Sequence, residues 1–412
     1  MNTIVCSSRN GEIKRGIPFF PKSAKKGANM KRKFQIKQII IAVAISILCF
    51  SSMAEEALKK SKKDETIKIG VILAVTGEAA ISNNHQYEVF KFAIDEVNTK
   101  GGVLGKKIEM LLIDNQSTGF GSKKAAQQAV DAGAVAVAGP AWSSHALGAA
   151  PILQKAKIPM VVTSATNPDV TLIGDYIFRV CFIDSFQGKV AANFAINDLE
   201  AKSAVVLTNA GSRYSTDIAQ FFMKYFQELG GNVLWEGDYL ASEIDFNRIL
   251  DKTKRLSPDV IYLPGYNKDS GFIIKQARKM GISVPFLGGD GWGPDIYKFG
   301  GDYVSGSYYS ESWHVDDPRE ESKSVINRFE SKHGKIKTTP LPYDALMVIV
   351  DAINRANSIN PQKIQQALAQ TKSFAGATGK ITFDENGNPI NKAAVILKFK
   401  NREIEYVKTI IP

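Results

Sequence analysis

Cysteine is scarce in this chain of 412 residues, which holds Cys6, Cys49 and Cys181 and no others. Three cysteines so far apart match neither a disulfide framework nor a metal site of the CxxC type. The four histidines are also far apart, whereas metal ligands occur as spaced sets. We therefore expect no metal and no cofactor, and a fold that is stabilised by its hydrophobic cores.

The glycine patterns of nucleotide and hydrolase sites are missing as well. No GxGxxG follows the first apolar run, and neither GxxxxGK[ST] nor GxSxG occurs in the chain. Residues 119–123 hold the residue types of a phosphate loop at another spacing, and they predict the start of a helix instead. An α/β enzyme is the alternative from another functional class, disfavoured because no nucleophile is paired with a base.

Positive charge is concentrated at one end of the chain. The net charge is +11, but ten of the 52 basic residues and one of the 41 acidic residues lie in residues 1–54. The remainder holds 42 basic and 40 acidic residues, a net of +2. A nearly neutral body lacks the clustered positive charge of a nucleic-acid-binding surface, so we expect no nucleic-acid partner.

Residues 1–54 read as a leader and signal peptide. A basic stretch from Met30 precedes a twelve-residue apolar run (39–50) and the small residues Ser52 and Ala54. This pattern predicts export to the periplasm with cleavage after Ala54, and the run is too short to span a membrane. Met30 is our hypothesis for the true start, and residues 55–66 are expected to form a flexible lead-in. A second interpretation makes Cys49 a lipid-attachment site, although Leu48 stands where lipoprotein signals carry a small residue.

Beyond residue 66, short apolar runs alternate with helical patterns. The runs indicate buried parallel strands at 67–74, 107–114, 134–139 and 159–163, and again at 203–208, 232–240, 260–265 and 285–289. The expected fold class is α/β, with two doubly wound Rossmann-like lobes. Helices near 320–333 and 344–355 follow, and a hairpin is expected around Asn401-Arg402. Helices that arrive after both sheets are complete suggest that the chain crosses back between the lobes.

Polar residues follow two strands of the first lobe, and ligands of open α/β sheets bind beyond the carboxyl ends of strands. Ser143 and Ser144 stand at a predicted helix N-terminus, where free N–H groups favour an anion. The alternative is that Ser144 only caps the helix. Ser164 and Thr166 occupy the equivalent place one strand later, where Pro168 makes an ordinary turn an equal alternative.

Three more polar residues follow strands of the second lobe: Tyr214, Tyr266 and Asp290. Asp290 lies in GGDGWG, and a carboxylate among glycines can approach a cationic group closely, although a solvated turn is the alternative. Together the two sets predict a cleft that closes on a small zwitterion. An anion site on the first lobe faces an acid on the second that binds ammonium.

Several motifs occur in a characteristic order and spacing. They are GGVLGKKIE (101–109), SATNP (164–168), FRV (178–180), PDVIYLPGY (258–266), IKQARKMGI (274–282), GGDGW (288–292) and PYDA (342–345). On these motifs the chain resembles the leucine/isoleucine/valine-binding branch of type I periplasmic binding proteins, the solute receptors of amino-acid ABC importers. The resemblance runs from about Lys68 to Phe383.

The resemblance implies two lobes joined by a three-strand hinge, with crossovers near Asp184, Trp313 and Glu385. Lobe 1 would comprise residues 67–184 plus 314–385, and lobe 2 residues 185–313 plus 386–412. The implied protein is a monomer that closes on an amino-acid-like ligand and delivers it to the membrane permease subunits of an ABC transporter.

The resemblance also implies roles for individual residues. Ser143, Ser164 and Thr166 would hold the α-carboxylate and α-ammonium of the ligand. Tyr214, Tyr266 and Asp290 would reach it from the opposite lobe. Asp290 would face the ammonium, where branched-chain binders usually carry glutamate.

Two departures from the family pattern concern the ligand side chain. Ser82 stands where a ligand-facing aromatic residue is expected, and Ser117 and Trp142 replace a cysteine pair of some members. Trp142 would suit a bulkier or more polar ligand than leucine. Receptors for amides, short peptides or aromatic acids are therefore the alternatives within the fold, and a sensor that reports to a signalling partner is the alternative in role.

Overall fold

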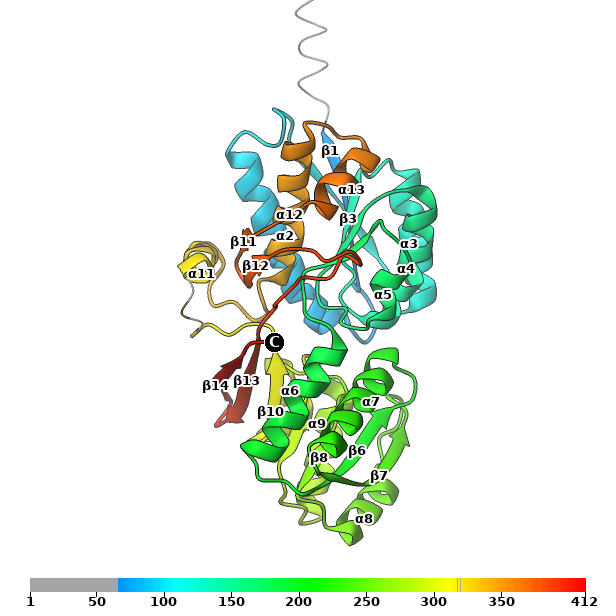
Figure 1. Ribbon diagram of the computed structural model, residues 1–412, viewed down its shortest axis with the longest axis vertical. Helices are drawn as coiled ribbons and strands as arrows, with labels where there is room; N and C mark the ends of the chain where they lie inside the picture. The colour runs from blue at the N-terminus through cyan, green and yellow to red at the C-terminus, as the bar shows by residue number, and fades with distance from the viewer. Residues whose placement is uncertain (1–65, 317, 319) are drawn as a thin grey trace, which may run out of the picture. The chain divides into compact units, whose positions relative to one another are not determined.

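Two mainly parallel β-sheets, each packed between helices, form the body of the protein (Figure 1). The structure is a computed structural model that describes residues 66–316, 318 and 320–412. The predicted leader and signal peptide (1–54), nearly all of the predicted lead-in (55–66) and Cys49 lie outside the described residues.

The first sheet has five parallel strands in the order β2-β1-β3-β4-β5. They are β1 (Ile67–Leu73), β2 (Ile108–Asp114), β3 (Ala136–Ala138), β4 (Met160–Val162) and β5 (Ile177–Arg179). The helices around it are α2 (Ala80–Thr99), α3 (Gly119–Asp131), α4 (Ser143–Ala156), α5 (Asp169–Leu172), α11 (Glu320–His333), α12 (Leu341–Ala356) and α13 (Pro361–Ala369). Ile69 of β1 packs in one core with α2 and α12, whereas Ile72, on the opposite face, packs in another with α3 and α4. Burial of both faces explains why the strands are continuously apolar.

The second sheet has seven strands in the order β14-β13-β10-β9-β8-β6-β7. They are β6 (Ser203–Asn209), β7 (Asn232–Tyr239), β8 (Val260–Tyr262), β9 (Phe286–Gly288), β10 (Tyr308–Glu311), β13 (Ala394–Lys400) and β14 (Glu403–Ile410). The helical segments around it are α6 (Asp184–Asn197), α7 (Arg213–Glu228), α8 (Asn247–Leu256), α9 (Asn267–Lys279), η1 (Pro294–Ile296), α10 (Tyr297–Gly300) and η2 (Gly301–Val304). Val205 packs in the core beneath α8 and α9, and Val206, on the other face, packs beneath α6 and α7.

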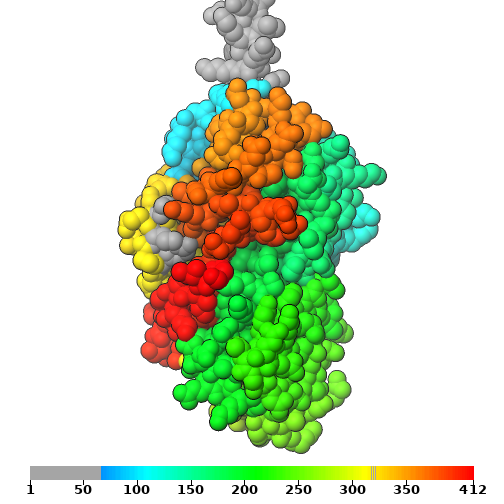
Figure 2. Space-filling model, viewed as in Figure 1, coloured from blue at the N-terminus to red at the C-terminus, as the bar shows by residue number. Residues whose placement is uncertain are grey.

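The chain passes between the two sheets three times: between β5 and α6, between β10 and α11, and between the small pair β11 (Phe374–Gly376) and β12 (Gly379–Ile381) and strand β13. The fold class predicted from the sequence is confirmed, and so is the C-terminal hairpin, in which β13 and β14 pair antiparallel. In the space-filling view the hairpin (red) lies beside green residues of the second sheet's helices (Figure 2). The residues at which each lobe begins and ends stay a prediction. Within the described residues, no helix combines the length and the apolar character that crossing a membrane requires.

Helices α3 and α4 pack closely because glycine lies at their contact. Helix α3 begins at Gly119, as the sequence predicts, and Thr118 caps it by accepting a hydrogen bond from the N–H of Gly121 at 2.8 Å. A Cβ added to Gly148 of α4 would lie 2.2 Å from the carbonyl oxygen of Gly119. This contact sets the position of α4, whose N-terminus faces the cavity described below.

We therefore expect Gly148→Ala to lower the free energy of unfolding by about 1–3 kcal/mol, the usual cost of overpacking. Urea denaturation measures this loss. The control is Gly211→Ala, whose added Cβ would meet just Asn209 Oδ1 at 3.4 Å, an ordinary contact. Equal stability of Gly148→Ala and the wild type would contradict the close packing of α3 on α4.

Candidate functional site

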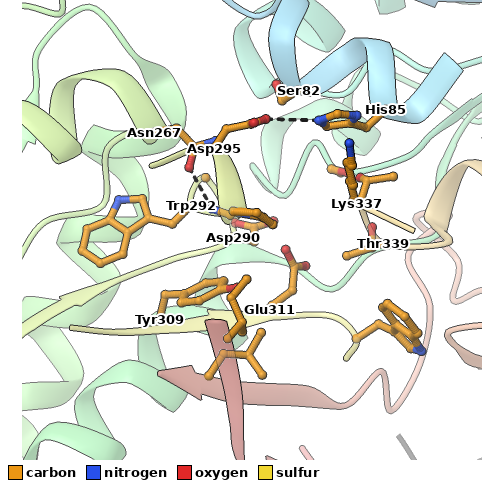
Figure 3. A pocket seen from close by; sticks show the side chains of 18 of the residues that line it. Ser82, His85, Asn267, Asp290, Trp292, Asp295, Tyr309, Glu311, Lys337 and Thr339 are labelled. Atoms are coloured by element: carbon orange, nitrogen blue, oxygen red, sulfur yellow. Dashed lines mark hydrogen bonds and ion pairs between the residues drawn. The ribbon is translucent and has the colours of Figure 1, made fainter. Parts of the chain in front are cut away.

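A cavity of about 580 Å³ lies where strand ends of the two sheets face each other (Figure 3). Segments that follow β3, β4, β8 and β9 contribute to its wall, as do α2 and the end of β10. This is the place at which open parallel sheets bind ligands, because connections diverge beyond the carboxyl ends of their strands.

Seven of the nine site residues predicted from the sequence line this cavity: Ser82, Trp142, Ser143, Ser164, Tyr214, Tyr266 and Asp290. Thr166 and Ser144 do not. Thr166 is fully buried away from the cavity wall, and Ser144 is the second residue of α4. The roles that the sequence assigns to all nine residues stay predictions.

The N-terminus of α4 forms one side of the cavity. Trp142 holds the N-cap position and its side chain makes no capping hydrogen bond, so Ser144 is not the cap that the alternative interpretation requires. Ser143 is 2% exposed, and its Oγ accepts a hydrogen bond from the N–H of Asn167 at 3.3 Å. The first N–H groups of a helix lack partners within it, and the helix dipole adds positive potential there, so this side suits an anion.

A buried arginine shapes the neighbouring loop that carries Ser164. The guanidinium of Arg179 donates to the carbonyl oxygens of Ala165 at 2.7 Å and Asn167 at 2.8 Å. It also donates to Thr171 Oγ1 at 3.2 Å, and the side chain is fully buried. Burial lowers its pKa. The arginine therefore stabilises the loop, because it donates hydrogen bonds to carbonyl groups that would otherwise be buried without partners.

Asp290 follows β9 on the other side of the cavity, between two glycines that cannot be replaced without a clash. A Cβ at Gly289 would lie 2.3 Å from Tyr214 Oη, and one at Gly291 would lie 2.4 Å from the carbonyl oxygen of Gly265. The N–H of Gly291 donates to Tyr214 Oη at 3.1 Å, which holds this turn against α7. The GGDGW sequence is thus required by packing as well as by any approach of a ligand.

Among the described residues, the carboxyl group of Asp290 has no counter-ion. Its Oδ1 has no hydrogen-bond partner. Burial raises its pKa to about 6, although hydrogen bonds from Gln187 and Tyr214 oppose the shift. Among the described residues, ion pairs at the cavity wall engage other acids, such as Asp295 with His85 of α2 at 3.4 Å.

The sequence analysis missed Glu311, a second acid in the same cavity. It ends β10, and its Oε1 accepts hydrogen bonds from the N–H and the Oγ of Ser312 at 2.6 and 2.8 Å. Burial, followed by the negative charge of Asp290, raises the pKa of Glu311 to about 8. The signal was available in the motif YYSESW, because an acid at the end of a strand obeys the rule that singled out Asp290.

Aromatic rings close the cavity between the two sheets. Trp142, which follows β3 of the first sheet, stacks on Tyr266, which follows β8 of the second, with ring centroids 3.7 Å apart and planes at 9°. The ring centroids of Tyr214 and Tyr266 lie 5.4 Å apart. Asn167 Nδ2 also donates to Asp217 Oδ2 at 2.6 Å across the same boundary. The structure is therefore a closed arrangement in which elements of both sheets contact each other over the cavity.

The arrangement favours binding over reaction. The cavity wall combines a helix N-terminus, several carboxyl groups and aromatic faces, and among the described residues no nucleophile of this wall contacts a base. His145, beside the wall, is buried, which lowers its pKa to about 4. In the part of the chain that the structure describes, no group of histidines, cysteines and acids is arranged to hold a metal ion.

Comparison with known proteins gives consistent matches over the described region. A family model described as "Periplasmic binding protein" matches residues 66–403. The leucine-, isoleucine-, valine-, threonine- and alanine-binding protein of Pseudomonas aeruginosa is 29% identical over 366 residues, which cover 87% of this chain and 94% of that protein.

Two solved structures share both sequence and fold with the chain. A leucine-binding protein from Thermotoga maritima is 36% identical, with a TM-score of 0.81, covering 84% of this chain and 99% of that one. A branched-chain amino-acid transporter substrate-binding protein from Streptococcus pneumoniae, in complex with isoleucine, is 31% identical, with a TM-score of 0.80, covering 84% and 100%. The family resemblance indicated by the sequence motifs is confirmed.

The raised pKa of Glu311 predicts a pH-dependent stability for the ligand-free protein. A carboxyl group whose pKa is higher in the folded than in the unfolded protein favours folding while protonated. This contribution is complete below the usual pKa of 4.5 and is lost as the pH rises towards about 8. We expect Glu311→Gln to reduce the loss of stability between pH 5 and pH 9 by on the order of 2 kcal/mol.

Urea denaturation of both proteins across this pH range tests the effect. The control is Glu403→Gln, which removes an exposed acid at the rim of the same cavity. Parallel pH profiles of Glu311→Gln and the wild type would show that Glu311 titrates normally.

Proposed function

Because the chain belongs to the family of periplasmic binding proteins, we propose that it is a solute receptor whose cavity closes on a small α-amino acid or a close analogue. The observation that carries this proposal is the pairing of opposite chemistries across the cavity. Ser143 and the N-terminus of α4 lie on one side, and the carboxyl group of Asp290 lies on the other. An α-carboxylate and an α-ammonium match these two sides.

The named ligands of the relatives support the same class. The Pseudomonas aeruginosa protein is named for five amino acids, and the Streptococcus pneumoniae structure holds isoleucine. In this chain Ser82 and the stacked pair of Trp142 and Tyr266 lie in the cavity wall, which supports a side-chain specificity other than that for leucine. The finer identity of the side chain is taken up in the next subsection.

The proposed setting follows from the family and from the leader. The receptor acts in the periplasm as a monomer and presents its closed form to the membrane subunits of an ABC transporter. Binding and closure form one step, in which the lobes rotate about the three connecting segments. Capture of permease subunits supports the transport role, and capture of a signalling protein would favour a sensor instead.

An aromatic acid without an amino group is the alternative ligand class. Such an anion suits the α4 side of the cavity but leaves the half-buried carboxyl groups of Asp290 and Glu311 without a counter-charge. The cost of an unpaired buried charge therefore favours a ligand with an ammonium group.

We expect thermal unfolding to identify the ligand class. The purified protein is unfolded and refolded to remove any bound ligand, then heated with amino acids, amides, dipeptides and aromatic acids. A ligand present at 100 times its Kd stabilises the folded state by about 2.7 kcal/mol, a shift of roughly 4 °C for a chain of this size. The shift should be confined to α-amino compounds and absent from Asp290→Asn, which keeps the shape of the side chain. A shift from aromatic acids alone would remove the amino-acid assignment.

Ser143→Ala tests the opposite side of the cavity. Loss of a hydrogen bond to the ligand carboxylate should weaken binding by roughly 1.5–3 kcal/mol, as measured by calorimetric titration. Ser144→Ala is the matched control, because its neighbouring hydroxyl does not line the cavity. Unchanged affinity with a lower melting temperature would restrict Ser143 to its hydrogen bond with Asn167.

A further inference from the structure

We propose that Glu311 forms a second cation site beside Asp290, so that the receptor selects an amino acid with a positively charged side chain over a neutral one. This inference rests on the proposed function and specifies its ligand class. It assigns to Glu311 the recognition of the side chain, and leaves the α-ammonium to Asp290.

The sheet register places the two acids side by side. Strands β9 and β10 are parallel neighbours, with Tyr309 paired to Gly288. Asp290 lies two residues beyond Gly288, and Glu311 two residues beyond Tyr309. Both residues line the same cavity (Figure 3). Each raises the energy of the other's charged form, and the charge of Asp290 is one cause of the raised pKa of Glu311.

One ammonium group does not neutralise two carboxylates. With a neutral amino acid bound, Asp290 would be paired, and Glu311 would either stay protonated or remain a buried negative charge next to an apolar side chain. Buried charges are stable when they are paired and hydrogen-bonded. A ligand with a second cationic group supplies the missing partner.

Among the described residues, the ion pairs made by cations of the cavity wall involve acids other than Asp290 and Glu311. Lys337, from the segment between α11 and α12, reaches the cavity, but Figure 3 shows its ammonium group on the side of His85, away from both carboxyl groups. Among the described residues, His85 pairs with Asp295 at 3.4 Å, and Arg402 with Asp302 at 2.8 Å. None of these ion pairs involves Asp290 or Glu311.

The walls around Glu311 suit a flexible chain that ends in a cation. Tyr309 and Trp313, two residues before and two after Glu311, also line the cavity, and Leu397 and Ile404 add apolar surface. Aromatic faces attract cations through their quadrupole, and apolar surface accommodates methylene groups. At the other end, the stack of Trp142 on Tyr266 limits the space for a bulky side chain. Glu311 and the aromatic and apolar residues around it therefore suit a side chain that ends in a cation.

Lysine and norleucine test this inference directly, because they have the same carbon skeleton and differ in the terminal ammonium group. Calorimetric titration of the refolded protein should show that lysine, ornithine or arginine binds more tightly than norleucine and leucine by about 10-fold or more. Glu311→Gln should lose most of this preference and keep its affinity for norleucine. Glu403→Gln, which removes an exposed acid at the cavity rim, should keep the preference of the wild type.

The outcomes separate this inference from the proposed function. If the wild type prefers norleucine or leucine to every cationic amino acid, the second cation site is excluded while the amino-acid receptor stands. The same exclusion follows if Glu311→Gln leaves the ratio of lysine to norleucine affinity unchanged. If cadaverine binds and no α-amino acid does, the acids bind cations but the proposed function fails. If Glu311→Gln does not fold, the affinities of the wild type for lysine and norleucine decide whether the second cation site exists.

Discussion

A carboxyl group buried without a counter-ion is the constraint on which the site depends. The turn that carries Asp290 allows no side chain at Gly289 or Gly291, and Tyr214 holds it against α7. The protein therefore fixes a carboxyl group where its ionisation is costly, and burial raises its pKa to about 6. An interior of this kind is unfavourable for the empty closed form and favourable for a cationic ligand. The cost of burying this carboxylate thus lowers the stability of the apo protein, and relief of that cost by a cation favours binding.

The two doubly wound sheets make this arrangement possible. Parallel strands point their carboxyl ends in one direction, so a sheet offers one edge at which loops from several strands meet. In this chain the three passages between the sheets turn two such edges towards each other. The first edge carries a helix N-terminus, and the second carries the acids, so the two edges offer complementary partners to the dipolar ligand that we propose. Two buried interactions outside the cavity hold the first edge in place. They are the close contact of Gly148 with α3 and the hydrogen bonds of Arg179.

Local pattern predicted the fold and much of the cavity wall. Continuous apolar runs marked the strands because both faces of each sheet are covered, and the residues after those strands included Ser143, Tyr266 and Asp290. The strand-end rule also applies to Glu311, but the pairing of β10 with β9, which sequence spacing does not reveal, is what places this acid beside Asp290. The contact of His85 with Asp295 likewise joins residues that are far apart in the sequence, so sequence spacing does not predict it.

Other differences arise at element ends. Helix α4 begins at Ser143, as the sequence predicts, but Trp142 and not a serine holds the N-cap position. Thr166 belongs to the same loop as Ser164, but the loop turns its side chain into the protein, where it is fully buried. A strand-end rule identifies the segment that reaches the cavity. It does not identify which side chain of that segment faces it.

Closure balances two opposing contributions. The stack of Trp142 on Tyr266 and the hydrogen bond from Asn167 to Asp217 join the lobes without any ligand, and each interaction of this kind contributes about 0.5–1.5 kcal/mol. Burial of Asp290 and Glu311 opposes the same movement, because both carboxyl groups lose water when the lobes meet. A ligand shifts the equilibrium only by its different affinity for the open and closed forms. Under the proposed selection of a cationic ligand, recognition of charge and lobe closure would be one event, and an apolar ligand of equal size would lack the larger part of this free energy.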